Sequence, residues 1–418
     1  MHVPRSPSRR AWLTACLTTA VAATVTLAPP APDPPLRWWK GNTHTHTYWS
    51  DGNAAPEHIV DWYVRHGYHF LVLSDHNILS QGEKWFPISE DGGRPLRRSH
   101  VEDLERRFGP GWVDERDDAG TPQMRLKNLP ELRSAFEHTG AFILIQGEEI
   151  TDRFEKHEVH VNGLNLAAVI PPQGGDSVRE TIQRNIDAVI AHGRAHDRSV
   201  LAHLNHPNFQ RSLTPEDVAA IRGERFFEVY NGHRGVLNHG DASTIGTEMM
   251  WDTALTLRLT TLRLGLLYGL ATDDAHDHHG LKTTSTPGRG WVWVQAASLA
   301  PDAIIDAMRA GRFYASSGVT LESVRTDDRT LQVAVAAEPG VTYTTEFIGT
   351  RLRDDAPVEV GAVLLRSTGA RVAYRMDDDV LYVRARVVAS RLHPNPFAEG
   401  DRETAWVQPV LGPAAGDR

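Results

Sequence analysis

Short apolar runs that end in a carboxylate or a histidine recur along the chain. Each run is bounded by turn residues and has the length of one buried strand. The runs occupy residues 38–46, 69–77, 141–149, 200–207, 225–233 and 266–276. Runs that stay apolar, instead of alternating with polar residues, are typical of strands buried on both faces, as in a parallel sheet. The pattern predicts such a sheet with polar side chains gathered at the carboxyl ends of its strands.

Amphipathic stretches separate these runs and predict helices between the strands. Pro56 begins one helix that ends near Gly67, and Ile182, Ile186 and Val189 have helical spacing within another at 178–196. Further helices are expected at 129–138, from 214, at 243–259 and at 300–310. The alternation continues to about residue 318, which predicts one α/β domain, a parallel barrel or sheet, over residues 38–318.

Residues 79–127 interrupt this domain with a polar segment that has no clear apolar period. The segment is rich in charges and carries glycine and proline at 92–95 and 109–111. A loop of this length is unusual in a compact domain. We expect either a lid that covers the substrate or a poorly ordered insertion.

Beyond Gly318, short alternating strands replace the helices. They are expected at 331–336, 342–348, 380–388 and 405–410. Residues 319–418 are therefore predicted to form a small antiparallel β module. No residue in it has the spacing of metal ligands, so we expect it to pack against the first domain or to border the substrate.

The first 30 residues have the composition of an export signal. Arginines, among them Arg9 and Arg10, precede an apolar stretch at 11–28 that is too short and too rich in small residues for a typical membrane span. Residues 8–13 resemble a twin-arginine signal, and an uncleaved anchor is the main alternative. Residues 31–37 form a proline-rich linker. The protein is thus predicted to be exported to the periplasm, the cell envelope or the medium.

Composition narrows the classes of partner and ligand. With 418 residues, of which 40% are hydrophobic, the chain can bury a sizeable core. A formal charge of -9 and the lack of a long basic run argue against nucleic acid as a main partner. Cys16, the only cysteine, lies in the signal, where a lipoprotein box is the less favoured interpretation. Without thiolates in the mature protein, any metal must be bound by nitrogen and oxygen.

Histidines and acids at the strand ends have the spacing of metal ligands. Successive strand residues point to opposite faces, so His44 and His46 point the same way, as do Asp274 and His276. Two such pairs that face one centre give a divalent ion four ligands. The strongest candidates are His44, His46, Asp51, His76, Glu149, His206, Asp274 and His276, followed by His160. This mixture of imidazole and carboxylate suits Zn, Mn or Fe, and more than one ion is needed to use it all.

The polar residues next to these candidates are less favoured as metal ligands. Only one residue of an adjacent pair on a strand faces inward, so Glu148 is the alternative to Glu149. Glu228, Asn231 and His233 close the run at 225–233, where they can orient ligands from behind. The histidines at 157 and 203 lie on strands with better candidates, and each either contacts a substrate oxygen or belongs to a hydrogen-bond network.

The motifs, in this order, resemble those of the PHP (polymerase and histidinol phosphatase) superfamily of metal-dependent phosphoesterases, and most of all its CehA/McbA-type metallohydrolases. They are GNTHTHTYWSDG, LVLSDHN, GEEIT, HVNGLN, NHPN, EVYNG and ATDDAHD, and they cover about residues 38–318. The trailing YVRARV and AWVQP segments also look like the β region of that group. The resemblance implies a distorted (β/α)7 barrel followed by the antiparallel β module.

The resemblance also implies a role for each matching residue. It makes Glu149 a carboxylate that bridges two ions. It makes ligands of His44, His46, His76, His206, Asp274 and His276. Asp51 occupies the position where some members of the superfamily carry a histidine ligand. This difference leaves the number of metal ions at two or three. His160 matches a histidine that binds metal or contacts the substrate.

The expected activity is hydrolysis of a small-molecule phosphoester by an exported enzyme with two or three divalent ions. The ions lower the pKa of a bound water, and the resulting hydroxide attacks phosphorus. His233 and His203 are the candidates for protonating the leaving group. Arg153, Arg234 and His157 are the candidates for binding an anionic substrate.

The same ligands suit two other functions. One is hydrolysis of a carboxylic ester, a carbamate or an amide, which an aromatic pocket would favour. The aromatic residues that keep this alternative open are Trp49, Trp62, Trp85 and Phe86. The third is a binding protein that captures its ligand through the metal without turnover.

Overall fold

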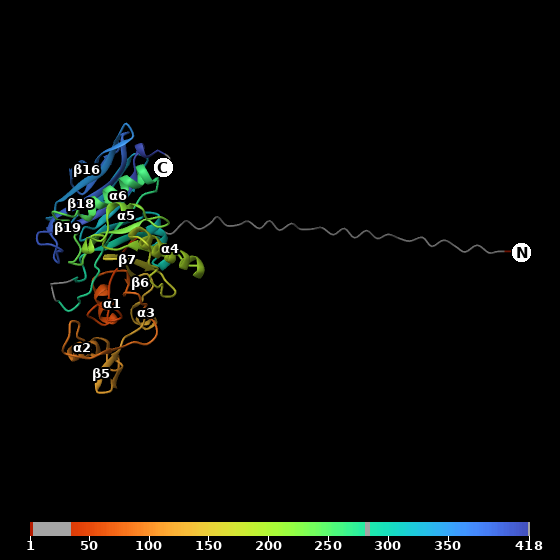
Figure 1. The fold of residues 1–418 in the computed structure, drawn as a ribbon, viewed down its shortest axis with the longest axis vertical. Helices are drawn as coiled ribbons and strands as arrows, with labels where there is room; N and C mark the ends of the chain where they lie inside the picture. The colour runs from red at the N-terminus through yellow and green to blue at the C-terminus, as the bar shows by residue number, and fades with distance from the viewer. Residues whose placement is uncertain (3–34, 281–284, 417–418) are drawn as a thin grey trace. The chain divides into compact units, whose positions relative to one another are not determined.

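In the computed structural model of the protein, the described residues are 1–2, 35–280 and 285–416. The chain separates into two units, residues 1–34 and 35–418, and the second holds every helix and strand given below (Figure 1). The predicted export signal and most of the predicted linker lie outside the described residues. Within the described part of the chain, no helix combines the length and the apolar character that a membrane crossing needs.

Among the described residues, 13 strands form one sheet. The first half of this sheet contains β1 (Arg37–Asn42), β2 (Phe70–Leu73), β6 (Ile143–Phe154), β7 (His157–Leu164), β8 (Leu201–Leu204), β9 (Phe226–Asn231) and β10 (Tyr268–Thr272). The second half contains β11 (Trp291–Ala296), β12 (Phe313–Ser316), β15 (Tyr343–Arg353), β16 (Ala356–Thr368), β18 (Val380–Leu392) and β19 (Arg402–Leu411). The order is β10-β9-β8-β7-β6-β2-β1-β11-β12-β19-β18-β15-β16. The protein is therefore a mixed α/β protein with a large central sheet.

Helices pack on this sheet where amphipathic segments separate the strands. They are α1 (Pro56–Arg65), α3 (Leu129–Phe136), α4 (Val178–His196), α5 (Pro215–Ala219), α6 (Thr247–Leu257) and α7 (Pro301–Arg309), with the short 3-10 helices η1 (Phe209–Arg211) and η3 (Pro413–Ala415) and the π-helix η2 (Arg258–Leu262). Ser177 begins α4 by accepting a hydrogen bond from the backbone N–H of Glu180, and Ile182, Ile186 and Val189 are buried. α4 packs against β6, β7 and β8, α6 against β9, and α7 against β11.

The expected (β/α)7 barrel is not confirmed. β1, β2 and β6 are parallel, and so are β8, β9 and β10, but β7 lies antiparallel between β6 and β8. The described strands form no closed barrel, because the other edge of β1 pairs with β11 and the sheet continues. An isolated bridge between Thr45 and Ala275 joins the segments after β1 and β10. The first and last strands of this half therefore meet beyond their carboxyl ends.

The strands beyond residue 318 extend the same sheet and add a second one. β12 pairs with β19, and β18, β15 and β16 follow in antiparallel pairs. β13 (Leu321–Thr326), β14 (Thr330–Val335) and β17 (Arg371–Arg375) form a separate three-stranded antiparallel sheet. The domain boundary at residue 318 stays a prediction, because strands on both sides of it belong to one sheet.

Residues 79–127 fold into a small element of their own. It contains β3 (Trp85–Pro87), α2 (Arg98–Phe108), β4 (Glu115–Asp118) and β5 (Thr121–Arg125), with the strands in the order β3-β5-β4. Its buried apolar residues include Ile88, Leu96, Leu104, Met124 and Leu126. The insertion therefore has a hydrophobic core.

A buried ion pair joins α6 to the C-terminal strands, and Figure 1 shows α6 beside β16 and β18. Arg384 donates from Nε and Nη2 to the two carboxylate oxygens of Asp252, at 2.8 and 2.7 Å. The two side chains are 1% and 3% exposed. Tyr382 donates to the same carboxylate at 2.9 Å, and the guanidinium lies over the ring of Trp251. Bidentate geometry of this kind satisfies both buried charges.

Replacing Arg384 by methionine should lower the free energy of unfolding by about 3–5 kcal/mol, because the carboxylate of Asp252 would stay buried without its partner. Urea denaturation of the purified chain measures this change. Arg366→Met is the control, since Arg366 is 66% exposed where it pairs with Glu346. Its loss should cost no more than about 1 kcal/mol. Equal costs for the two substitutions would contradict a stabilising role of the buried pair.

Candidate metal centre

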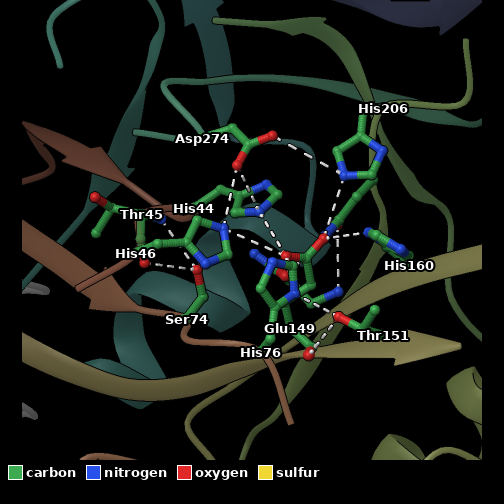
Figure 2. A network of polar contacts seen from close by, with 12 residues as sticks. His44, Thr45, His46, Ser74, His76, Glu149, Thr151, His160, His206 and Asp274 are labelled. Atoms are coloured by element: carbon green, nitrogen blue, oxygen red, sulfur yellow. Dashed lines mark hydrogen bonds and ion pairs between the residues drawn. The ribbon is translucent and has the colours of Figure 1, made fainter. Parts of the chain in front are cut away.

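Nine histidine, aspartate and glutamate side chains meet where β1, β2, β8 and β10 end (Figure 2). They are His44 and His46 after β1, Asp51 in the loop beyond, His76 after β2, Glu149 on β6, His160 on β7, His206 after β8, and Asp274 and His276 after β10. The structure thus brings together the eight residues that the sequence ranked first as metal ligands, and His160, which it ranked behind them. These residues are far apart in the sequence. Six strands and the loop after β1 bring their side chains to one place.

Glu149 lies in the middle of the cluster, and each of its oxygens faces different histidines (Figure 2). Its Oε2 lies 3.3 Å from Nε2 of His44 and from Nε2 of His46. Its Oε1 lies 2.9 Å from Nδ1 of His160 and 3.2 Å from Nε2 of His206. The carboxylate is therefore shared by two groups of ligand atoms.

Four buried atoms in the cluster are candidate ligand atoms, two nitrogens that each lie within 3.3 Å of two carboxylate oxygens. They are Nε2 of His44 and His46, Oε2 of Glu149 and Oδ1 of Asp274, and none has a hydrogen-bond partner among the described residues. Oδ1 of Asp274 lies 3.3 Å from Nε2 of His44 and 3.1 Å from Nε2 of His46. Four tetrahedral ligands bound to one zinc ion at their usual bond lengths lie about 3.3 Å apart. The residues present therefore fit a divalent ion.

A second group lies further out around Asp51. Its Oδ2 is 3.4 Å from Nε2 of His76, and its Oδ1 is 3.3 Å from Nε2 of His276 and 3.5 Å from Nδ1 of His46. The side chain of Asp51 is 45% exposed, whereas those of His76 and His276 are 25% and 20% exposed. This group is the part of the cluster that is open to solvent.

Hydrogen bonds orient two of the imidazoles toward the cluster. Nδ1 of His44 donates to Oε1 of Glu228 at 2.7 Å, and Nδ1 of His276 donates to the backbone carbonyl of Asp274 at 2.8 Å. A carboxylate and a carbonyl can only accept, so the proton is on Nδ1 in both rings. Each ring then presents the lone pair of Nε2, which a metal ion requires.

Glu228 and Asn231 lie behind the ligands, where the sequence led us to expect them. Oε2 of Glu228 accepts hydrogen bonds from the backbone N–H of His206 and from Nδ2 of Asn231, both at 2.8 Å. The same Nδ2 lies 3.1 Å from Oδ2 of Asp274. These two residues thus connect three candidate ligands from separate segments.

Opposite charges keep Glu149 ionised and His76 and His160 protonated when no metal is bound, whereas burial and the neighbouring His276 and His76 lower the pKa of His46 to about 3. Burial raises the pKa of Glu149, but the charges of His76, His44 and His160 outweigh it and hold that pKa well below its usual range. Burial lowers the pKa of His76, but Glu149 and Asp51 raise it to about 11. His160 is affected in the same way by Glu149 and has a pKa of about 9. The cluster therefore attracts cations.

Two candidate ligands have a backbone conformation that is rare outside glycine. The φ angles of His206 and Asp274 are 20° and 46°. The backbone N–H of Asp274 donates to the carbonyl of His44 at 3.0 Å, and that of His206 donates to Glu228. Left-handed conformations of this kind cost energy and are found at functional sites, where surrounding contacts maintain them.

The candidates for proton transfer are placed differently from each other. His203 was expected at the rim, but it is fully buried, with Nδ1 3.9 Å from Oε1 of Glu228. It lies behind His44 because β8 turns this side chain into the core. His233 is partly exposed, and its ring centroid lies 5.4 Å from that of His276. The N–H of Gly235 donates to Nδ1 of His233 at 3.1 Å, so its proton is on Nε2.

The three candidates for substrate binding lie outside the cluster of ligands. Arg153, on the β6–β7 hairpin, and Arg234, next to His233, are both exposed. Nδ1 of His157 donates to the backbone carbonyl of Ser212 at 2.9 Å. His157 therefore connects β7 to the segment after η1, and its expected contact with substrate stays a prediction.

Glu149 and Asp274 face the cluster, and the acidic residues that precede them face away from it. Glu148 faces away from the cluster and accepts a hydrogen bond from the backbone N–H of Ile170 at 2.6 Å, and burial raises its pKa to about 7. Asp273 also faces away and accepts hydrogen bonds from the N–H groups of Arg289 and Gly290. The choice of Glu149 and Asp274 over their neighbours agrees with this geometry. For Glu149 the reason is alternation along β6, and Asp274 lies beyond the end of β10.

Three residues around the ligands were missed from the sequence. Nδ2 of Asn205 donates to Oε1 of Glu149 at 2.9 Å, Thr272 donates to Glu228 at 2.9 Å, and Oε2 of Glu158 lies 3.4 Å from Nε2 of His160. Asn205 directly precedes His206, so its position in the motif was a usable signal. Glu158 lies two residues before His160 on β7, so alternation along that strand was a signal as well. Thr272 could be found only once β10 is known to lie beside β9.

No protein-family model and no curated protein matches the chain. Solved structures similar to it include a two-domain protein from Bacteroides vulgatus that contains a predicted PHP-like metal-dependent phosphoesterase (17% identity, 88% of this chain, 95% of that chain, TM-score 0.40). A protein from Bifidobacterium adolescentis described as a proposed metal-dependent phosphoesterase is 16% identical (58% of this chain, 89% of that chain, TM-score 0.28). An amidohydrolase from Chromobacterium violaceum is 12% identical (59% of this chain, 89% of that chain, TM-score 0.31). With identities and TM-scores this low, the similarities carry no argument about this chain.

Substituting Glu149 by glutamine should weaken metal binding by more than about 100-fold, because the neutral amide keeps one oxygen and replaces the other by an NH2 group that cannot bind a metal ion. The amount of Zn or Mn retained after dialysis, measured by plasma mass spectrometry, gives the result. Glu148→Gln is the matched control, since its amide oxygen can still accept the hydrogen bond from Ile170. A Glu149→Gln protein that retains as much metal as this control would rule out the proposed centre.

Metal binding should release protons near neutral pH. His76 and His160, with pKa values of about 11 and about 9, are protonated in the metal-free protein and must become neutral to bind an ion. Because both pKa values are raised, affinity should rise as pH increases from neutrality toward about 9. Titration calorimetry in two buffers of different ionisation enthalpy measures the proton count. An enthalpy that is independent of the buffer would show that no proton leaves.

Proposed function

We propose that the protein is an exported metal-dependent hydrolase of the PHP superfamily that cleaves a phosphoester. The observation that carries the proposal is the convergence of buried imidazole and carboxylate atoms from distant segments at the separations of a coordination sphere. The motif order supports the family, because the candidate ligands from every ligand-bearing motif belong to one cluster. Export is supported by the signal-like sequence alone, and recovery of a shortened chain outside the cytoplasm would test it.

The donor set supports two or three divalent ions. The side chains divide into overlapping groups: His46, Asp51, His76 and His276; His44, His46 and Glu149; His44, His206 and Asp274; and Glu149, His160 and His206. Donors that are only nitrogen and oxygen suit Zn, Mn or Fe. Bound ions would make hydroxide available at neutral pH and stabilise the negative charge that develops on the substrate.

The role of Glu149 in this proposal follows from its two-sided contacts. Oε2 belongs to the group with His44 and His46, and Oε1 to the group with His160 and His206. A carboxylate that offers one oxygen to each of two groups is suited to bridge two ions. Glu228 keeps His44 in the tautomer that leaves Nε2 free for this centre.

His233 is the side chain that we propose as the proton donor. It is partly exposed, it lies beside His276, and its Nε2 carries the proton. Burial, together with the charges of His276 and His206, lowers its pKa, although Asp274 opposes this. A lowered pKa makes the imidazolium form a stronger acid, and this form arises when Nδ1 of the neutral ring takes up a proton from solvent before Nε2 donates to the leaving group. The buried His203 offers no comparable route to a substrate.

The surroundings of the cluster favour a phosphoester over a carbamate. Arg153 and Arg234 are exposed on segments that carry His160 and His233, so their guanidinium groups are available to an anion. Trp49, one of the aromatic residues that would favour a carbamate, is 2% exposed and is buried in the core of the insertion. The aromatic side chain of Phe209 lies beside the cluster, with its ring centroid 5.1 Å from that of His206.

The test is hydrolysis by the purified mature chain loaded with Zn, Mn or Fe. The substrates are p-nitrophenyl phosphate, bis-p-nitrophenyl phosphate, p-nitrophenyl acetate and a p-nitrophenyl carbamate. We expect turnover of a phosphate ester that His44→Ala abolishes. Turnover of only the acetate or the carbamate would replace the phosphoesterase with the alternative hydrolase. Metal binding without any turnover would favour the third function, a ligand-binding protein.

Replacing His233 by alanine should lower kcat for an alkyl phosphate by about 100-fold, because the poor leaving group needs a proton. The effect on a p-nitrophenyl ester should be much smaller, since p-nitrophenolate leaves without help. Rates for both substrates under saturation give the comparison. His138→Ala, far along the chain on the turn after α3, is the control. Equal losses for the two leaving groups would exclude His233 as the acid.

A further inference from the structure

The loop at residues 47–53 holds the most solvent-exposed candidate ligand. The side chain of Asp51 is 45% exposed, whereas those of Glu149 and Asp274 are 1% and 6% exposed. An exposed side chain on a loop does not keep one position unless the backbone around it is held. The contacts of this loop therefore decide whether Asp51 stays near His46, His76 and His276.

One set of contacts comes from the body of the protein. The carboxylate of Asp75, next to His76, accepts hydrogen bonds from the backbone N–H of Thr47 at 2.8 Å and from Oγ of Ser50 at 2.6 Å. The loop also packs tightly on itself. A Cβ added at Gly52 would lie only 2.5 Å from the carbonyl oxygen of His46, so only glycine fits there. These contacts fix the base of the loop.

A second set of contacts comes from the insertion at residues 79–127. Nη1 of Arg94 donates to the carbonyl oxygen of Ser50 at 2.7 Å and to that of Gly52 at 3.2 Å. These two carbonyls belong to the residues on either side of Asp51. One guanidinium therefore holds both peptide groups that flank the candidate ligand.

Other hydrogen bonds between the insertion and the loop lie on its aromatic side. The hydroxyl of Tyr48 donates to the carbonyl of Pro95 at 2.9 Å, and Nε1 of Trp49 donates to that of Lys127 at 3.0 Å. The ammonium group of Lys84 donates to the carbonyl of Trp49. The loop is thus bonded to both ends and to the middle of the insertion.

The loop and the insertion also share one hydrophobic core. Tyr48 and Trp49 are 0% and 2% exposed, and they pack with Leu96, Leu104 and Met124 of the insertion. Burying two aromatic side chains in that core makes the loop and the insertion order together. Any loosening of the insertion would therefore reach Asp51.

We propose that the insertion is a clamp that positions Asp51, with Arg94 as the positioning residue. This inference rests on the proposed metal centre and deepens it. Occupancy of the outer position, formed by His46, Asp51, His76 and His276, depends on the insertion, whereas the inner ligands around Glu149 are held by the sheet. The insertion thus acts on the metal centre through the loop that carries Asp51. It does not need to cover the substrate to have this effect.

The experiment compares metal binding by the full mature chain and its Arg94→Ala variant. Mn is titrated into the metal-free proteins, and the number of bound ions and the affinity of the last one are measured. We expect Arg94→Ala to weaken the last step by about tenfold or more, as for other residues that orient ligands, and to leave the earlier steps unchanged. Arg94→Lys should restore most of the affinity, because an ammonium group can also donate to the two carbonyls.

Arg98→Ala is the matched control. Arg98 is an arginine of the same insertion that pairs with Glu115 and does not contact the loop. Its removal should leave every binding step as in the wild type. Equal weakening by Arg98→Ala and Arg94→Ala would mean that general loosening of the insertion is responsible, and it would overturn the role of Arg94.

A double substitution shows whether Arg94 acts through Asp51. Asp51→Asn should weaken the same last step, and Arg94→Ala added to it should weaken that step no further. Additive losses would overturn the clamp. An unchanged metal titration with a raised KM in Arg94→Ala would also overturn it and would make Arg94 a contact of the substrate.

The outcomes separate this inference from the proposed function. A wild-type protein that binds no metal contradicts both the centre and the clamp. A protein that binds metal but hydrolyses nothing contradicts only the proposed reaction, since the clamp is measured by binding. If Arg94→Ala is less stable than expected, Tyr48→Phe, which removes one hydrogen bond and keeps the ring, must give the same selective weakening of the last step.

Discussion

A buried carboxylate surrounded by imidazoles is the interaction on which the metal centre depends. Glu149 is 1% exposed, and an unpaired charge in such a place costs several kcal/mol. Its oxygens lie within 3.3 Å of nitrogen atoms of His44, His46, His76, His160 and His206. These contacts keep the carboxylate ionised, and in return they raise the pKa of His76 and His160. Because so many imidazoles repel one another when protonated, a compact divalent cation is a better partner for the carboxylate than protons are.

The backbone brings these groups together through a few contacts beyond the strand ends. The bridge between Thr45 and Ala275 joins the first and last strands of the half-sheet at the place where the ligands begin. Hydrogen bonds across this bridge run from Asp274 to the carbonyl of His44 and from His46 to that of Ala275, at 3.0 and 2.9 Å. The positive φ of Asp274 lies at the same point. The sheet remains open, yet these contacts place the two i,i+2 pairs face to face.

Different parts of the chain hold different parts of the centre. The inner ligands are connected by Glu228 and Asn231, which are 0% and 1% exposed. The outer ligand Asp51 lies on a loop whose flanking carbonyls are bonded to Arg94 of the insertion. The β-rich end of the chain is joined to α6 through Arg384 and Asp252, away from the ligands. Rigid inner ligands beside an outer ligand on a loop would allow one position to be adjusted without disturbing the others.

The sequence by itself determined the chemistry of the centre and much of its local geometry. The i,i+2 spacing of His44 with His46 and of Asp274 with His276 is a local property of the sequence. Alternation along β6 requires that only one of Glu148 and Glu149 face inward, and the fold decided that it is Glu149. Helix α4 was likewise predictable from its own apolar spacing. The tertiary structure decided that β7 is antiparallel, that His160 therefore reaches Glu149, that His203 is buried behind His44, and that the insertion holds Asp51. These features depend on pairing between segments far apart in the chain, and the order and direction of such pairing are set by the packing of the whole sheet.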